Sequence, residues 1–124
     1  MCGKKYRNDD VGIPASPGFV KGEKIYLSSP EEPIVKDKIL LAMITDPDWL
    51  PHLMSSKGAV TAYGGFLCHT AIVCRELGIS CVTGIGEESL EALKNNKSKF
   101  IEIDGNIGSI KTSNMGIELS QERK

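Results

Sequence analysis

The fold and the chemistry of this chain are decided by the stretch Gly64-Gly65-Phe66-Leu67-Cys68-His69-Thr70-Ala71-Ile72-Val73-Cys74-Arg75, in which one histidine stands between two glycines and a predicted helix. A neutral imidazole is an adequate nucleophile near pH 7, and the phosphoramidate that it forms can pass its phosphoryl group on. The first turn of a helix adds unpaired N–H groups and a positive dipole end, which stabilise a phosphate dianion. The pattern therefore predicts a phosphoryl carrier with His69 as the acceptor.

The residues that surround His69 supply the other candidates for stabilising the phosphate. Thr70 and Ala71 lie in the first predicted turn, where backbone N–H groups are free, and Thr70 adds a hydroxyl. Gly64 and Gly65 allow a tight turn that leaves room for another domain to approach. Arg75 is six residues beyond His69, about two-thirds of a turn out of phase, so it either bridges to a partner domain or caps the end of the helix. Both roles of Arg75 remain open.

The helix that begins at His69 is predicted to end at Leu77, with Gly78 as a left-handed cap. Its residues available for packing are Ala71, Ile72, Cys74 and Leu77. The neighbouring pair Cys68-His69 could be a thiol nucleophile with its base, but adjacent residues on a helix project about 100° apart, and no third orienting residue is evident.

Strands alternate with short helices over the rest of the chain. Residues 12–18 form a turn-rich lead into the first strand; strands are predicted over residues 19–27, 39–44, 59–63, 79–83, 99–104 and 108–111, and further helices over residues 47–57 and 88–94. The apolar run 39–44 is typical of a buried central strand. This order predicts a compact, three-layer or barrel-like α/β domain.

The predicted helix over residues 47–57 has a clear start signal. Thr45 or Asp46 can cap it, Pro47 suits the first helical position, and Asp48 favours the positive dipole end, so capping explains both aspartates without a metal site. Gly58 is expected to stop the helix. Its apolar residues Trp49, Leu50, Leu53 and Met54 gather on one face, which predicts a packing role, and His52 is predicted to lie on the surface.

Composition excludes several classes of function. Fifteen basic and sixteen acidic residues among 124 leave a formal charge of -1, which gives no reason to expect nucleic acid or an anionic membrane as partner. The longest apolar stretch is far below the about 20 residues of a membrane span, and the N-terminus lacks an apolar signal core, so the cytoplasm is expected. The four cysteines (Cys2, Cys68, Cys74 and Cys81) lack CxxC spacing and are expected to be reduced thiols, two or three of them packed in the core.

The chain is expected to form one domain over residues 12–112, between a flexible N-terminal segment, residues 1–11, and a polar C-terminal tail, residues 113–124. The sequence Gly84-Ile85-Gly86 hints at a nucleotide-binding loop, but the third glycine is absent and two glutamates follow. It is predicted to be a strand-to-helix turn.

Four blocks, in the right order, resemble the swivelling phosphohistidine (mobile) domain of PEP-utilising enzymes such as PEP synthase, pyruvate phosphate dikinase, rifampicin phosphotransferase and, more distantly, enzyme I of the sugar phosphotransferase system. They are residues 12–18, 45–51, 64–79 and 103–108. The resemblance implies a swivelling β/β/α phosphohistidine fold, in which His69 is phosphorylated at one enzyme site and carried to another.

The resemblance also implies what the chain lacks. ATP or PEP, with Mg²⁺, would bind to partner domains: an ATP-grasp-type nucleotide-binding domain and a PEP- or pyruvate-binding domain or other acceptor enzyme. No cofactor is expected on this domain itself, which is at most one component of a dikinase-type phosphotransferase. A stand-alone carrier and a domain of a larger enzyme are both compatible with the sequence.

The chain departs from the family at Leu67, where relatives usually have threonine or another small polar residue that in some dikinases is a regulatory phosphorylation site. Such control is chemically impossible at leucine. Cys68 and Cys74 stand where serine and alanine are commoner, which are small changes. The rival hypothesis, for which Leu67 is the hint, is a non-catalytic interaction or regulatory module that keeps the fold without phosphotransfer.

Overall fold

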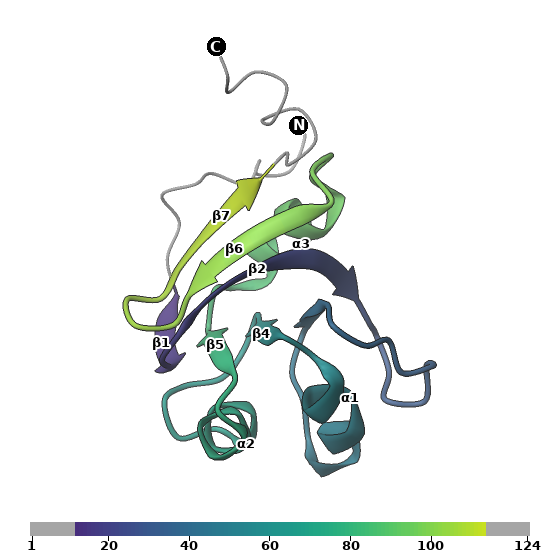
Figure 1. Cartoon of the computed structure of the whole chain (residues 1–124), viewed down its shortest axis with the longest axis vertical. Helices are drawn as coiled ribbons and strands as arrows, with labels where there is room; N and C mark the ends of the chain where they lie inside the picture. Colours follow the sequence, from purple (N-terminus) through teal and green to yellow (C-terminus); the bar gives the residue numbers. More distant parts are fainter. Residues whose placement is uncertain (1–11, 114–124) are drawn as a thin grey trace.

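A computed structural model describes residues 12–113 of the chain, so the predicted N-terminal segment 1–11 and residues 114–124 of the predicted tail 113–124 lie outside the described residues. Ser113, predicted to belong to the tail, is the last residue of the final strand. Figure 1 shows how the elements are arranged. The strands are β1 (Ile13–Ser16), β2 (Phe19–Tyr26), β3 (Ile39–Ala42), β4 (Gly58–Thr61), β5 (Ser80–Thr83), β6 (Phe100–Asp104) and β7 (Ser109–Ser113). The helices are the 3₁₀ turn η1 (Pro47–Trp49), α1 (Leu50–Ser55), α2 (His69–Leu77) and α3 (Glu87–Asn95).

The strands form one sheet in the order β1-β5-β4-β3-β2-β6-β7. Strands β2, β3, β4 and β5 are parallel, and β1, β6 and β7 pair antiparallel with their neighbours. Parallel neighbours need a crossover connection, which α1 provides between β3 and β4 and α2 provides between β4 and β5. The mixed α/β class predicted from the sequence is confirmed.

The sheet curls until its two ends meet. The backbone N–H of Gly12 donates to the carbonyl of Gly108 over 2.7 Å, and the N–H of Gly105 donates to the carbonyl of Gly18 over the same distance. These bonds fasten the β6–β7 turn to the two ends of β1. The approach is so close that a Cβ on Gly105 would lie 1.8 Å from the carbonyl oxygen of Ser16. The curled sheet agrees with the barrel-like alternative.

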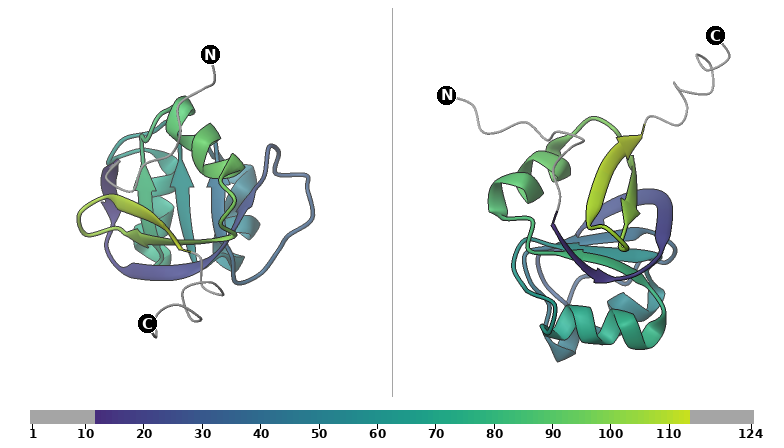
Figure 2. Two further views of the ribbon diagram at one scale, coloured as in Figure 1. Left: turned by 90° about the horizontal axis from the view of Figure 1, so that it is seen from above. Right: turned by 90° about the vertical axis from the view of Figure 1, so that its left-hand side faces the viewer.

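Helices cover both faces of the parallel strands. Figure 2 shows α2 on one side of these strands and α3 on the other, and Figure 1 shows α1 beside α2. Strand β3 is buried along its whole length, because Leu40 and Ala42 belong to the core under α1 and α2 while Ile39 and Leu41 belong to the core near α3. Alternate residues of a strand point to opposite faces, so a strand between two helical layers must be apolar throughout. The predicted buried strand is confirmed, although it ends two residues early, at Ala42.

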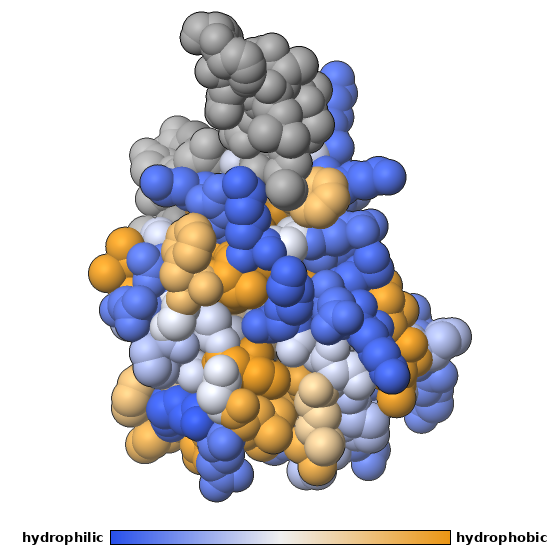
Figure 3. Space-filling model, in the orientation of Figure 1, coloured by the Kyte–Doolittle hydropathy of each residue, from blue (hydrophilic) through white to orange (hydrophobic). Residues whose placement is uncertain are grey.

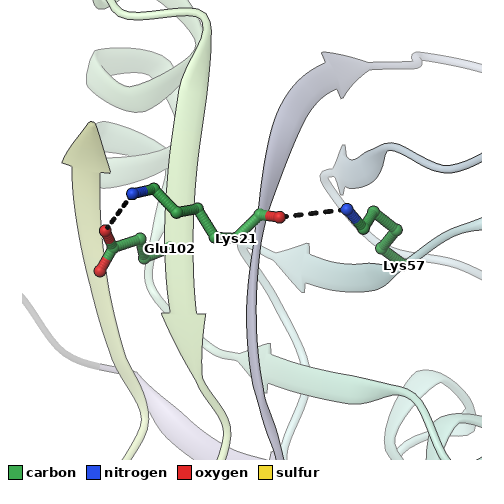
Figure 4. Close-up of polar contacts among 3 residues, drawn as sticks. All are labelled: Lys21, Lys57 and Glu102. Carbon is green, nitrogen blue, oxygen red and sulfur yellow. Dashed lines mark hydrogen bonds and ion pairs between the residues drawn. The ribbon is translucent and has the colours of Figure 1, made fainter. Parts of the chain in front are cut away.

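Strand β2 joins the parallel strands to the β6–β7 hairpin, since it pairs with β3 on one side and with β6 on the other. Figure 4 shows two side-chain contacts that stabilise β2 in this position. The Lys21 ammonium lies 3.4 Å from a carboxylate oxygen of Glu102 on β6. The Lys57 ammonium, just before β4, donates to the backbone carbonyl of Lys21 over 3.2 Å. Gly22 leaves the space for this side chain, since an added Cβ would lie 3.1 Å from Cδ of Lys57.

Three predictions about the N-terminal half need correction. Residues 13–16 form strand β1 on β5, where only a turn-rich lead was expected, because Pro14 sits at an edge that tolerates a missing N–H donor. The predicted helix 47–57 is a 3₁₀ turn followed by α1, which ends at Ser55 with Ser56 as its cap, so Gly58 begins β4 and does not stop the helix. The predicted cap is confirmed, since Asp46 Oδ1 accepts from the N–H of Asp48.

The face of α1 was also only partly predicted. Trp49 and Leu53 are buried, but Leu50 and Met54 are exposed, because the 3₁₀ turn changes the phase between the start of the helix and its second half. His52 is buried and not on the surface as predicted. Its Nε2 lies 2.9 Å from the carbonyl oxygen of Pro30, and its ring packs 5.5 Å from the Trp49 ring.

Candidate functional site

His69 is the first residue of α2, as predicted, and its side chain is half-buried. The N-cap residue Cys68 has an extended backbone and makes no side-chain cap hydrogen bond. The first turn of α2 therefore keeps N–H groups that the cap side chain does not satisfy. Gly78 ends the helix with φ of 73°, which confirms the predicted left-handed cap.

Thr45, whose hydroxyl is hydrogen-bonded to that of Thr70, contacts the His69 imidazole at Nδ1. The Thr45 hydroxyl oxygen lies 3.2 Å from Nδ1 of His69 and 2.6 Å from the hydroxyl oxygen of Thr70. Thr45 and Thr70 are both almost fully buried. Among residues 12–113, Nε2 of His69 has no hydrogen-bond partner, so this nitrogen is the one left for chemistry.

The sequence pointed to Thr70 but missed Thr45, which was considered only as a helix cap. The two threonines come from different elements, since Thr45 follows β3 and Thr70 belongs to α2. The carboxyl ends of parallel strands are where α/β sheets gather their functional side chains. That topological rule, applied to the buried strand 39–42, is the signal that could have found Thr45.

The loop that precedes His69, residues 62–68, is called the carrier loop after the role predicted for that histidine. A glycine and two more threonines fix its conformation. Gly64 has φ of 128°, and a Cβ there would lie 2.8 Å from Sγ of Cys68, so glycine is needed for conformation and for space. A Cβ added at Gly65 would meet no atom within 4 Å, so this side of the turn is open. The Thr61 hydroxyl donates to the carbonyl of Tyr63 over 2.8 Å, and the Thr83 hydroxyl donates to that of Gly65 over 3.4 Å.

Arg75 is engaged within the domain. Its Nη1 donates to the carbonyl of Ala15 on β1 over 2.6 Å, and its guanidinium carbon lies 4.2 Å from the centroid of the Phe66 ring. Of the two roles left open for Arg75, the cap on its own helix is wrong, because Nη1 donates to Ala15 on β1 and not to the end of α2. The bridge to a partner domain stays a prediction. Arg75 thus fastens α2 to the edge strand and supports the carrier loop.

The remaining predicted site residues are placed as follows. Ala71 lies on the buried side of α2. Ile72 and Leu77, which were expected to pack, are exposed. Leu67 is 75% exposed. Gly84-Ile85-Gly86 joins β5 to α3, which confirms the predicted strand-to-helix turn.

The described cysteines are free thiols. Cys74 and Cys81 are buried and Cys68 is half-buried. The hydrogen bond with the Cys74 thiol, together with burial, raises the pKa of Cys81 above its ordinary value. Residues 12–113 contain no group of three or more His, Cys, Asp or Glu side chains placed to hold a metal ion, and no helix in this range could cross a membrane.

The comparisons with known proteins show the family of this chain. The model of the PEP-utilising enzyme mobile domain matches residues 34–108, which include Thr45, the carrier loop and His69. The chain belongs to this family. The mobile domain described here is 35% identical over 116 residues to phosphoenolpyruvate synthase of Aeropyrum pernix, covering 91% of this chain, and 43% identical over 99 residues to the probable phosphoenolpyruvate synthase of Methanothermobacter thermautotrophicus, covering 78%.

Rifampicin phosphotransferase of Bacillus subtilis is 35% identical to this mobile domain over 101 residues, or 81% of the chain. The chain spans only 14% of the length of the two synthases and 11% of that of the phosphotransferase. Among solved structures, aconitase X of Thermococcus kodakaraensis has a similar fold, with a TM-score of 0.59 at 15% identity over 83% of this chain and 96% of that chain. That likeness concerns the fold alone.

Proposed function

We propose that this mobile domain is a phosphoryl carrier, which accepts a phosphoryl group on Nε2 of His69 from an ATP- or PEP-derived donor site and delivers it to a second site. The observation that supports this most is the hydrogen bond between Thr45 and Nδ1 of His69. With Nδ1–H donating to the Thr45 hydroxyl, the imidazole tautomer has its lone pair on Nε2. The Thr45 hydroxyl can in turn donate to that of Thr70.

The transfer then follows from ordinary nucleophilic chemistry. Nε2 attacks the phosphorus, the N–P bond forms, and the bond from phosphorus to the leaving oxygen breaks with its electron pair. The ring becomes a phosphoimidazolium whose Nδ1–H keeps its acceptor in Thr45. In the second half-reaction an acceptor oxygen attacks the phosphorus, and the N–P electron pair returns to Nε2.

The first turn of α2 stabilises the phosphorylated state. The free backbone N–H groups of Thr70 and Ala71 form the positive end of the helix, which typically stabilises an anion in an exposed site by about 0.3–1 kcal/mol. Gly64 allows the tight turn before His69, and the open space beside Gly65 leaves room for a partner domain to approach. ATP or PEP, with Mg²⁺, belongs to the partner domains: an ATP-grasp-type nucleotide-binding domain and a PEP- or pyruvate-binding domain or other acceptor.

The rival function is a non-catalytic interaction module that keeps the fold. A purely structural histidine is expected to be buried and bonded at both ring nitrogens, as polar groups in cores usually are. His69 is half-buried and leaves Nε2 unbonded among the described residues, whereas the buried His52 is closer to the structural description. The contrast between the two histidines favours the carrier.

Intact-mass spectrometry tests the proposal. The chain is incubated with the nucleotide-binding part of a PEP synthase and Mg–ATP, or with a PEP-binding part and PEP. We expect one acid-labile phosphoryl group on the wild type and on His52→Gln, which retains a donor toward Pro30, and none on His69→Ala. A wild-type chain that stays unmodified with every donor would favour the interaction module.

A further inference from the structure

Several large apolar side chains are exposed in the segments that lead to and follow His69. Phe66 is 55% and Leu67 75% exposed, and three further large apolar residues nearby are also exposed. We call these five the carrier ring: Ile44, Tyr63, Phe66, Leu67 and Ile72. Figure 3 shows hydrophobic residues, interspersed with hydrophilic ones, over the lower part of the molecule, where Figure 1 places α1 and α2. Exposed apolar residues that cluster on a surface mark interaction sites.

The backbone places all five members close to the imidazole. Ile44 precedes Thr45, whose hydroxyl contacts His69, and the N–H of Tyr63 donates to the carbonyl of Met43 over 3.0 Å, which puts Tyr63 beside Ile44. Phe66 and Leu67 lie within the carrier loop. Ile72 is three residues beyond His69 in α2 and so shares its side of the helix.

A specific contact keeps part of the carrier ring in place. Phe66 is held outside by the Arg75 guanidinium, which is itself bonded to Ala15. A side chain that is already ordered loses less entropy when a partner covers it. The carrier ring is therefore suited to bind a partner. None of its five side chains is covered by residues 12–113.

The charges around the ring indicate what kind of surface fits it. Lys57 and Arg75 are the only lysine and arginine between residues 39 and 83. Arg75 is bonded to Ala15, and Lys57 contacts β2 from the start of β4, at the opposite end of that strand from the carrier loop. Asp46 and Asp48 are exposed just beyond Thr45. A phosphoryl group on Nε2 thus meets no free cationic side chain from residues 39–83.

From this combination we infer that the carrier ring docks onto a partner domain whose surface is apolar at its centre and carries lysines or arginines at its rim, and that these cations neutralise the phosphoryl group and pair with Asp46 and Asp48. The inference rests on the proposed carrier function and names the partner chemistry of the same site. Apolar contact supplies the adhesion, and the partner's cations make docking tighter when His69 is phosphorylated.

Phosphoryl transfer from the nucleotide-binding part of a PEP synthase tests this surface. Leu67→Asp places a carboxylate at the centre of the apolar contact, and its matched control is Ile107→Asp, a comparably exposed apolar residue in the β6–β7 turn and outside the carrier ring. We expect kcat/KM for transfer to fall about tenfold or more in Leu67→Asp and to stay unchanged in Ile107→Asp. Chemical phosphorylation with phosphoramidate, which needs no partner, should be equal in all three proteins.

The charge component has its own variant. The Asp48 carboxylate has no hydrogen-bond partner in the described residues, because its backbone N–H and not its carboxylate meets Asp46. Asp48→Lys should lower kcat/KM severalfold and make transfer less sensitive to salt. An unchanged salt dependence overturns the cationic rim, whatever happens at Leu67.

The outcomes separate the inference from the function beneath it. If the wild type accepts phosphate and Leu67→Asp does so equally fast, the docking surface is wrong and the carrier stands. If the wild type never accepts phosphate, both are wrong. Sedimentation that shows a concentration-dependent dimer, lost in Leu67→Asp, would identify a second copy as the occupant and overturn the inference.

Discussion

The Thr45 hydroxyl oxygen lies 3.2 Å from Nδ1 of His69 although the two residues are 24 positions apart in the chain. Thr45 lies in the segment that follows the buried strand β3, and His69 is the first residue of α2. The contact orients the ring, and a Thr45 hydroxyl that accepts from Nδ1–H leaves the lone pair of the imidazole on Nε2.

Replacing Thr45 with valine should impair the carrier while leaving the fold intact. Valine keeps the shape but removes the hydroxyl, so His69 loses its orienting partner and the Thr70 hydroxyl loses one as well. We expect phosphorylation by a donor domain to slow about tenfold, which corresponds to about 1.4 kcal/mol in the barrier. The rate of acid-labile labelling measures this.

Thr45→Ser is the matched variant, because it keeps the hydroxyl and loses only a methyl group. It should be phosphorylated within about twofold to threefold of the wild-type rate. Equal rates for valine and serine at this position would show that the hydroxyl does not orient the imidazole.

The sequence predicted what depends on local pattern and missed what depends on tertiary contact. The α2 boundaries and the Gly78 cap follow from a periodic helix and a left-handed stop, and β3 follows from an unbroken apolar run. The burial of His52 could not be predicted, because its partner, the carbonyl of Pro30, is 22 residues away in a loop without a pattern of its own. The Thr45 contact was missed for the same reason, since only the parallel sheet brings it to His69.

Arg75 should contribute to stability and not only to the site. Arg75→Met keeps an apolar stem over Phe66 but leaves the carbonyl of the fully buried Ala15 without its donor. We expect a loss of about 1–3 kcal/mol in the free energy of unfolding, measured in urea. Arg75→Lys can still reach the carbonyl and should recover part of this loss. A methionine variant as stable as the wild type would show that water replaces the guanidinium fully.

The closure of the curled sheet predicts that any residue larger than glycine at position 105 strongly destabilises the fold. A Cβ there would lie 1.8 Å from the backbone oxygen of Ser16, so the β6–β7 turn must move away from β1 and the hydrogen bond between Gly105 and Gly18 must break. We expect Gly105→Ala to cost about 3 kcal/mol or more, or to prevent folding altogether. Gly65→Ala is the control, because nothing lies within 4 Å of its Cβ position. Its free energy of unfolding should differ from that of the wild type by no more than about 0.5 kcal/mol.

Lys24 predicts a pH dependence at the other end of the molecule. Its ammonium donates to the carbonyls of Leu93 and Asn96 over 2.6 and 2.9 Å and so caps α3, while partial burial lowers its pKa below the ordinary 10.5. A lowered folded-state pKa means that the unfolded chain holds the proton more tightly. Stability conferred by Lys24 should therefore increase as the pH rises from the folded-state pKa to 10.5.

The comparison with Lys24→Met isolates this group, because every other titration is common to both proteins. Unfolding by urea at a series of pH values gives the difference in free energy. At neutral pH the methionine variant should lose the cap on α3 and gain relief from a buried charge, so the two proteins should differ by about 1 kcal/mol or less. Toward pH 10.5 the free energy of unfolding of the wild type should rise relative to that of the variant, since the Lys24 amine still donates to the carbonyls once it is neutral. If the stability difference between the wild type and Lys24→Met instead shrinks toward pH 10.5, the carbonyls at the end of α3 stabilise the charged ammonium more than burial destabilises it.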